Sequence, residues 1–69
     1  MNERPFVLRG IREISAQAGI NWKMFGHFVH KKGLPVWRYE GTGPYLSLVE
    51  DINQWLRDQR DKYLNQRTL

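Results

Sequence analysis

The side chains of this chain that could do chemistry gather between residues 22 and 32, where basic and imidazole groups recur at helical spacing. On a helix over this range, Phe25, Phe28 and Val29 would share one side. The opposite side would carry Lys23, Gly26, His27, His30 and Lys31. A surface helix usually mixes glutamate with lysine, but this side has no acid. Because a carboxylate would repel phosphate, the pattern favours contact with a polyanion; a basic, solvated face is the plainer alternative.

The same side chains do not indicate a metal site or a catalytic centre. His27 and His30 are spaced to share a metal ion, but this face offers no third ligand and the chain has no cysteine. No serine or threonine is expected beside a histidine, and no glycine-rich phosphate loop is present. We therefore expect no bound metal, no small-molecule cofactor and no enzymatic activity. Partly protonated imidazoles near phosphate explain the two histidines better.

Two short helices and a turn must position these groups. The first helix is predicted over residues 11–18, and its inward side would consist of Ile11, Ile14, Ser15 and Ala18. Gly19 can end it in the left-handed conformation, and the Asn21 side chain can cap the second helix, over 22–32. Gly33-Leu34-Pro35 would stop that helix. This is the helix-turn-helix plan, whose second helix enters the DNA major groove.

Three positions near the turn each admit two interpretations. Within a helix, a glycine at position 26 lowers helix stability by up to about 1 kcal/mol relative to alanine. It would either let the helix approach a groove floor or allow close packing against the arm or wing. Arg12 opposes the helix dipole in the first turn, and either a phosphate lies there or the side chain is simply solvated. Trp22 could stack on a sugar, but we expect it to pack on the body of the protein.

A β-hairpin is predicted over residues 36–46, where two runs of aromatic and β-branched residues flank Gly41-Thr42-Gly43. Val36 and Leu46 would face the core. The outward side chains would be Arg38, Tyr39 and Thr42. A hairpin directly after a recognition helix is a wing. The predicted fold class is therefore mainly α with a small β-hairpin, a winged helix-turn-helix of three helices plus wing.

The third helix is predicted to begin at a capping box, Ser47-Leu48-Val49-Glu50. Its apolar stripe would consist of Leu48, Val49, Ile52, Trp55, Leu56 and Tyr63. Beyond Leu56 the helix is rich in charge, and it is either a solvated extension or a dimer contact through Tyr63. The predicted organisation is an N-terminal arm over 1–9, with an extended piece at 6–8, one domain over 10–64 and a disordered tail over 65–69.

The positive charge lies in the first half of the 69-residue chain. Residues 1–38 hold seven basic groups and two acids, net +5, whereas residues 39–69 have a net charge of −1. Double-stranded DNA is a partner that explains this asymmetry, through phosphate neutralisation and counterion release. No membrane-spanning run or basic-then-apolar leader is seen. The absence of cysteine fits a reducing compartment. We expect a cytoplasmic protein.

The order and spacing of these motifs resemble a known group of DNA-binding domains. Ile11, Glu13-Ile14-Ser15, Gly19-Ile20 and Phe25 stand where MerR-type domains have an Ile, a Glu-Leu-Ala-like triplet, Gly-Val and a Leu. The Gly-Leu-Pro stop, the wing and the run from Leu46 to Leu56 resemble the excisionase and AlpA-type branch of that superfamily. The chain is also similar to the phage lambda-type terminase small-subunit DNA-binding domain. The resemblance covers about residues 10–57.

This resemblance implies a winged helix-turn-helix with residues 22–32 in the major groove and residues 36–46 on an adjacent groove or backbone. It implies a transcriptional regulator or a recombination directionality factor of a phage or mobile element, acting near the nucleoid as a monomer, homodimer or cooperative assembly. A protein-interaction module and the DNA-reading head of a larger packaging protein are the alternatives. Related recognition helices carry arginines, which this one lacks. The predicted DNA-binding residues are Arg12, Lys23, His27, His30, Lys31, Arg38, Tyr39 and Thr42.

Overall fold

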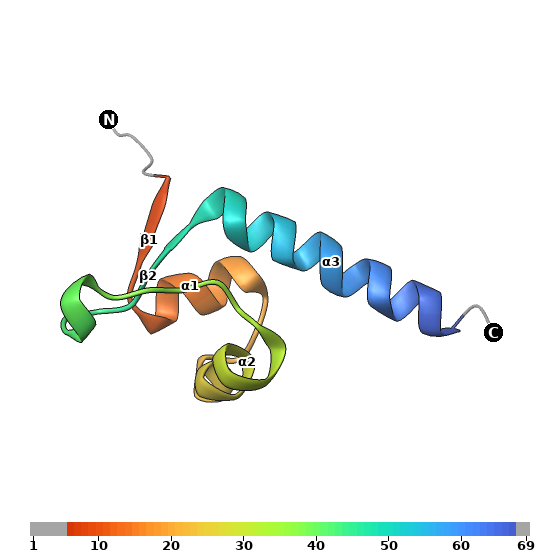
Figure 1. Cartoon of the computed structure of the whole chain (residues 1–69), viewed down its shortest axis with the longest axis horizontal. Coiled ribbons are helices and arrows are strands. Elements are labelled where there is room, and N and C mark those ends of the chain that lie inside the picture. Colours follow the sequence, from red (N-terminus) through yellow and green to blue (C-terminus); the bar gives the residue numbers. More distant parts are fainter. Residues whose placement is uncertain (1–5, 68–69) are drawn as a thin grey trace.

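The computed structural model describes residues 6–67, and the side chains as far as residue 66. Its elements are β1 (Val7–Arg9), α1 (Ile11–Ala18), α2 (Phe25–Lys32), β2 (Leu46–Leu48) and α3 (Val49–Arg67), with 3-10 turns at Trp22–Met24 and Tyr39–Gly41. Figure 1 shows α1 and α2 beneath the first half of α3, whose second half extends away from them. The mainly helical fold with three helices and a small antiparallel β element is confirmed, and it is compatible with a winged helix.

The β element pairs differently from the predicted hairpin over 36–46. β2 pairs antiparallel with β1, and Leu8 lies opposite Ser47. The segment before the loop contributes one bridge, in which Trp37 and Leu46 exchange hydrogen bonds of 2.9 and 2.7 Å. The pairing between the segments before and after the loop ends at this bridge. Residues 39–41 form a 3-10 turn, and Pro44 has no N–H to donate to a partner strand. The extended piece expected at 6–8 is therefore part of the sheet, as β1, while residues 1–5 of the predicted arm lie outside the described residues.

The core lies between α3 and the two-helix unit. It consists of Leu8, Ile14, Ala18, Phe25, Leu34, Ile52 and Trp55. The Trp55 ring meets the edge of Phe28, with centroids 6.0 Å apart, and its indole N–H donates to the Lys32 carbonyl at 2.9 Å. This bond ties α3 to the last turn of α2, where carbonyls have no partner in their own helix. Ile11 is an exception to the predicted inward face of α1, since it is 38% exposed.

The predicted capping box at the start of α3 is wrong. Ser47 is fully buried within β2, and its hydroxyl donates to the Pro35 carbonyl at 2.5 Å. The helix begins at Val49, whose N–H donates to the Phe6 carbonyl at 2.8 Å. Pairing with β1 holds Ser47 in a strand, so its hydroxyl cannot cap the helix. At the other end α3 runs to Arg67, past the domain end expected at 64, and only residues 68–69 of the expected tail lie outside the described part of the chain.

The turn between α1 and α2 follows the prediction closely. Gly19 and Gly33 end the two helices in the left-handed conformation, with φ of 72° and 73°. The Asn21 side chain accepts the Lys23 N–H at 2.9 Å, as expected of a cap. The predicted continuous helix over 22–32 is not observed, because Trp22–Met24 form a 3-10 turn before α2. A 3-10 turn has about three residues per turn, so Lys23 does not follow the rows of α2.

Candidate nucleic-acid interface

The solvent-facing side of α2 makes few contacts with the rest of the described protein, and these contacts do not explain why it carries only basic, imidazole and glycine residues. Phe25 is buried, and Phe28 and Val29 pack against the core. Gly26, His27, His30 and Lys31 are all exposed. Within residues 6–66, the His27 ring contacts the Phe28 ring edge to face, with centroids 5.5 Å apart. The predicted facing of this segment is therefore confirmed, and its cationic and imidazole side chains are open to a partner.

Gly26 is not needed for the packing of this domain. A Cβ placed on Gly26 would have no other atom within 4 Å, and its φ is not in the left-handed region. Close packing against the wing, or against residues 6–9 of the predicted arm, is therefore not the reason for a glycine here. Alanine would favour the helix by up to about 1 kcal/mol. The remaining explanation is that a binding partner approaches α2 closely at Gly26, where a side chain would obstruct it.

A second group of predicted residues gathers around Trp22. The guanidinium carbon of Arg12 lies 4.4 Å from the Trp22 ring centroid, and the Lys23 ammonium nitrogen lies 5.9 Å from it. Trp22 is 43% exposed, so it packs on the body of the protein only in part, through the Arg12 side chain of α1. The cations of α1 and the 3-10 turn hold the ring at the surface through cation–π attraction. We call Arg12, Trp22 and Lys23 the Trp22 cluster.

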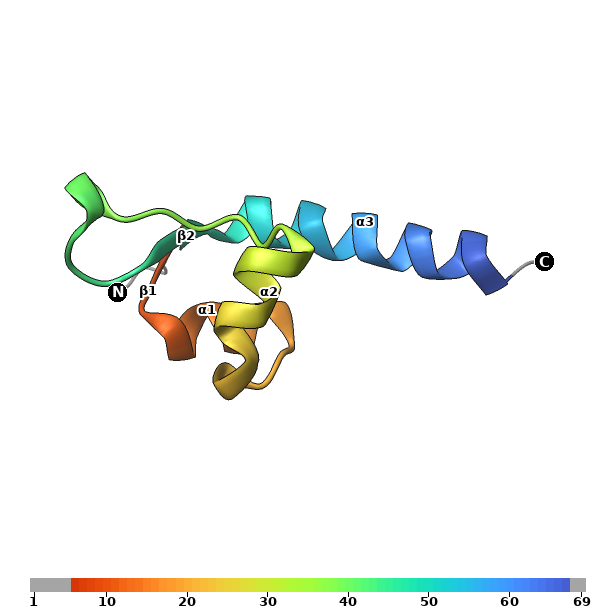
Figure 2. The same ribbon diagram turned by 60° about the horizontal axis from the view of Figure 1, so that its bottom comes forward.

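Residues 36–46, which the sequence predicts as a wing, hold Arg38 near their base; we call this segment the wing. Arg38 Nε donates to the Gly43 carbonyl at 3.0 Å, and its guanidinium carbon lies 4.7 Å from the Tyr45 ring centroid. Tyr45 in turn contacts Phe25 of α2, with centroids 5.0 Å apart. Tyr39 is 70% exposed near the tip of the loop. Figure 2 shows this loop and the second half of α3 extending to opposite sides of the two-helix unit.

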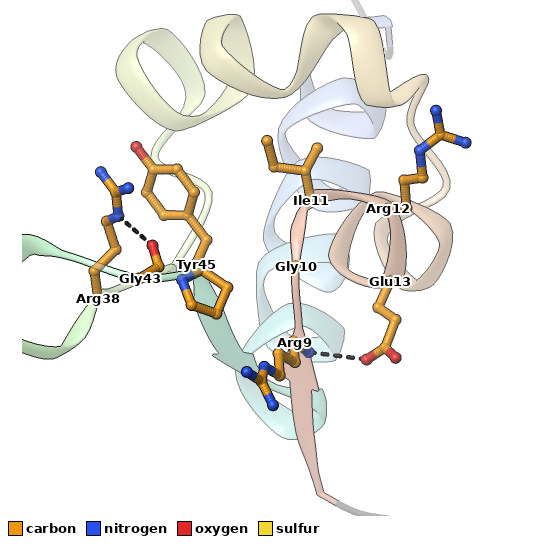
Figure 3. A pocket seen from close by; sticks show the side chains of 9 residues that line it. Arg9, Gly10, Ile11, Arg12, Glu13, Arg38, Gly43 and Tyr45 are labelled. Atoms are coloured by element: carbon orange, nitrogen blue, oxygen red, sulfur yellow. Dashed lines mark hydrogen bonds between the residues drawn. The ribbon is translucent and has the colours of Figure 1, made fainter.

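Two neighbouring hollows separate the wing from the start of α1. The first, about 460 Å³, is lined chiefly by Arg9, Ile11, Arg38, Gly43, Pro44 and Tyr45; we call it the wing hollow. The second, about 390 Å³, lies between β1 and the wing. It shares Arg9, Gly43 and Pro44 with the first and adds Tyr39, Thr42 and Leu46. In Figure 3, Arg38 and Tyr45 lie on one side of the wing hollow and Ile11 on the other, while the guanidinium of Arg12 points away.

Arg9 is the residue that the sequence analysis missed. Its side chain is exposed because Leu8 is the inward residue of β1, and it reaches the wing because Arg9 pairs with Leu46. The alternation of side chains along a strand could have predicted that Arg9 points to the opposite side from Leu8. Its neighbours could not be known, because they depend on a pairing with a strand far along the chain.

Acidic groups mark the limit of this basic surface. From Ile14 to Tyr39 the chain has no acid. Asp51 and Asp58 of α3 line a separate shallow hollow with Gly33, beyond the end of α2. The charge asymmetry of the sequence is therefore also an asymmetry in space, with the two-helix unit on the basic side, whereas residues 36–46 carry both Arg38 and the exposed Glu40. In residues 6–66, no group of three His, Cys, Asp or Glu side chains is placed to hold a metal ion.

Fold and surface together define a small helical domain with a two-helix unit, a short antiparallel sheet and a basic face. The chain matches no protein-family model, and neither the curated proteins nor the solved structures contain a significant match to it. The described helices include none with the length and apolar character needed to cross a membrane.

Proposed function

We propose that this protein binds double-stranded DNA as a winged helix-turn-helix. The residues at 22–32 would enter the major groove, and the wing would contact an adjacent groove or the backbone. One observation carries the proposal: the exposed face of α2 has only basic, imidazole and glycine positions, and Gly26 meets no other part of the described protein. The Trp22 cluster and the arginines of the wing hollow extend this basic surface on both sides.

The composition of α2 bears on how such a protein would select a site. An arginine that contacts guanine through two hydrogen bonds is the commonest base-specific contact, and α2 has no arginine. Base selection would therefore rest on His27, His30 and Lys31, on the wing and on DNA shape. We propose a transcriptional regulator or a recombination directionality factor of a phage or mobile element, which binds weakly as a monomer and more tightly as a dimer or cooperative assembly. The resemblance to excisionase-like domains supports this role.

A protein-interaction module is the second candidate, and the exposed aromatic side chains of the wing favour it. Trp37 is 38% exposed and Tyr39 is 70% exposed. The DNA-reading head of a larger packaging protein would have the same DNA-binding surface as the first candidate. Salt dependence separates DNA binding from a protein contact through aromatic side chains, because only binding to phosphates releases many counterions.

Fluorescence anisotropy on a mixed-sequence duplex tests the proposal. Binding is expected at low salt, and the logarithm of the association constant should fall linearly with that of the salt concentration. The absence of binding at low salt would overturn it. Selection of a preferred site from a random pool would then show, by the symmetry of that site, whether one or two copies bind.

Lys23→Ala and His27→Ala are expected to weaken this binding without unfolding the protein, because both side chains are exposed. Loss of one phosphate contact at Lys23 should reduce the salt slope by about one. Loss of one hydrogen bond at His27 should cost about 1 kcal/mol. Lys62→Ala, on the exposed second half of α3, is the control and should bind like the unmodified protein. If either variant loses its cooperative thermal melt, the assignment of outward faces is wrong.

Gly26→Ala should separate stability from binding. The substitution is expected to raise the free energy of unfolding by about 0.5–1 kcal/mol, since alanine favours a helix and its methyl group meets nothing within the described protein. The same methyl group would lie between α2 and the groove floor, so duplex affinity should fall. Urea denaturation and anisotropy measure the two effects. A variant that is more stable and binds equally well would show that α2 does not approach DNA at Gly26.

A further inference from the structure

The wing hollow combines two cations with an apolar floor, which is the chemistry of a site for a sugar-phosphate. Arg9 and Arg38 come from β1 and the wing and line the same hollow. Ile11, Pro44 and Tyr45 supply apolar surface between them. A volume of about 460 Å³ lies within the size range of small-ligand sites.

Arg38 is already oriented for an anion. Its Nε donates to the Gly43 carbonyl, and its planar group lies over the Tyr45 ring. These contacts leave the two terminal nitrogens of the guanidinium to donate together, which is the geometry that suits phosphate. A side chain held in this way loses little conformational freedom when it binds.

The two arginines have no carboxylate partner within residues 6–66. Glu13, the nearest acid in the lining, accepts the backbone N–H of Arg9 at 2.9 Å. Figure 3 shows Glu13 on the far side of the Gly10 backbone from Arg38. The hollow therefore presents unneutralised positive charge beside an apolar floor, and an anion with an apolar neighbouring group would complement both.

We infer that the wing hollow binds one sugar-phosphate unit, with its phosphates at the two ends of the hollow, where Arg9 and Arg38 lie, and the sugar against Ile11 and Pro44 (Figure 3). The unit is either part of a DNA backbone or a free nucleotide. In the first case the inference rests on the proposed function, and the hollow would fix the wing and α1 on one strand beside the groove that α2 enters. Arg9 then joins the DNA-binding residues.

Thymidine 3′,5′-bisphosphate, which carries the two phosphates of one backbone unit, is the probe for the hollow itself. Titration of the full chain, followed by amide NMR signals, should shift the signals of residues 9–13, Gly43 and Tyr45. Arg9→Ala and Arg38→Ala should abolish these shifts. Arg57→Ala, an exposed arginine on α3, is the matched control and should leave them unchanged. Arg9→Ala removes an exposed side chain that makes no hydrogen bond or ion pair within residues 6–66, so it tests the site even if Arg38→Ala disturbs the wing.

Duplex binding distinguishes the two sources of the ligand. If the unit belongs to DNA, Arg9→Ala and Arg38→Ala should each weaken duplex binding and reduce the salt slope by about one. If the bisphosphate shifts the hollow but no duplex binds the unmodified protein, a free nucleotide is the ligand and the proposed function fails. If the bisphosphate shifts nothing at the hollow and both variants bind duplex normally, the inference is overturned. The effect of Lys23→Ala would then still report on the proposed function.

Discussion

Replacing Trp55 with alanine is expected to lower the free energy of unfolding by about 3–5 kcal/mol. The indole is 8% exposed, contacts Phe28 and belongs to the core between α3 and the two-helix unit. Its removal leaves a cavity as well as lost apolar burial. Small domains have total stabilities near the low end of about 5–15 kcal/mol, so much of this protein should then be unfolded at room temperature. Circular dichroism with urea denaturation measures the change.

Two further variants separate the contribution of the indole hydrogen bond from that of the buried apolar surface of Trp55. Trp55→Phe keeps most of the apolar volume but leaves the Lys32 carbonyl without the indole N–H, and it should cost about 1–3 kcal/mol. Trp37→Ala removes an indole that is 38% exposed, so its cost should be clearly smaller than that of Trp55→Ala. Equal losses for Trp37→Ala and Trp55→Ala would mean that α3 does not pack on α2 through Trp55.

Ser47→Ala and Ser15→Ala should change stability in opposite directions. Ser47 is fully buried and its hydroxyl donates to the Pro35 carbonyl, so alanine leaves that carbonyl unpaired and should cost about 1–3 kcal/mol. Ser15 is 2% exposed and its hydroxyl has no partner in the described part of the chain. Alanine there removes a buried polar group and should raise the free energy of unfolding by about 1 kcal/mol.

Each serine variant is the control for the other, because both remove one hydroxyl from a buried position. Denaturation in urea gives the two free energies under identical conditions. A destabilising Ser15→Ala would show that its hydroxyl has a partner. A neutral Ser47→Ala would show that the bond to Pro35 contributes nothing to the attachment of β2 to the segment after α2.

The local features of the two-helix unit were predictable from sequence. Gly19 and Gly33 end their helices as expected, and Asn21 caps the next turn. Each of these depends on residues within a few positions along the chain, because a cap satisfies the backbone groups of one helical turn. The inward face of α2 followed from helical periodicity for the same reason, since residues three and four apart share a face. The inward face of α3 followed only from Val49 to Leu56, because Leu48 of the predicted stripe lies in β2 and Tyr63 is 63% exposed.

Only the tertiary structure decided which of these elements meet. The pairing of β1 with β2 made Ser47 a buried strand residue instead of a helix cap, and it placed Arg9 on the hollow that Arg38 also lines. The stacking of Arg12 on Trp22 likewise joins two elements across the turn. A short strand has several partners of similar energy, and the choice among them depends on the whole core. The spacing of residues along one helix therefore determined the basic face of α2, whereas the wing hollow exists because packing placed β1 and the start of α1 next to the wing, which is distant in sequence.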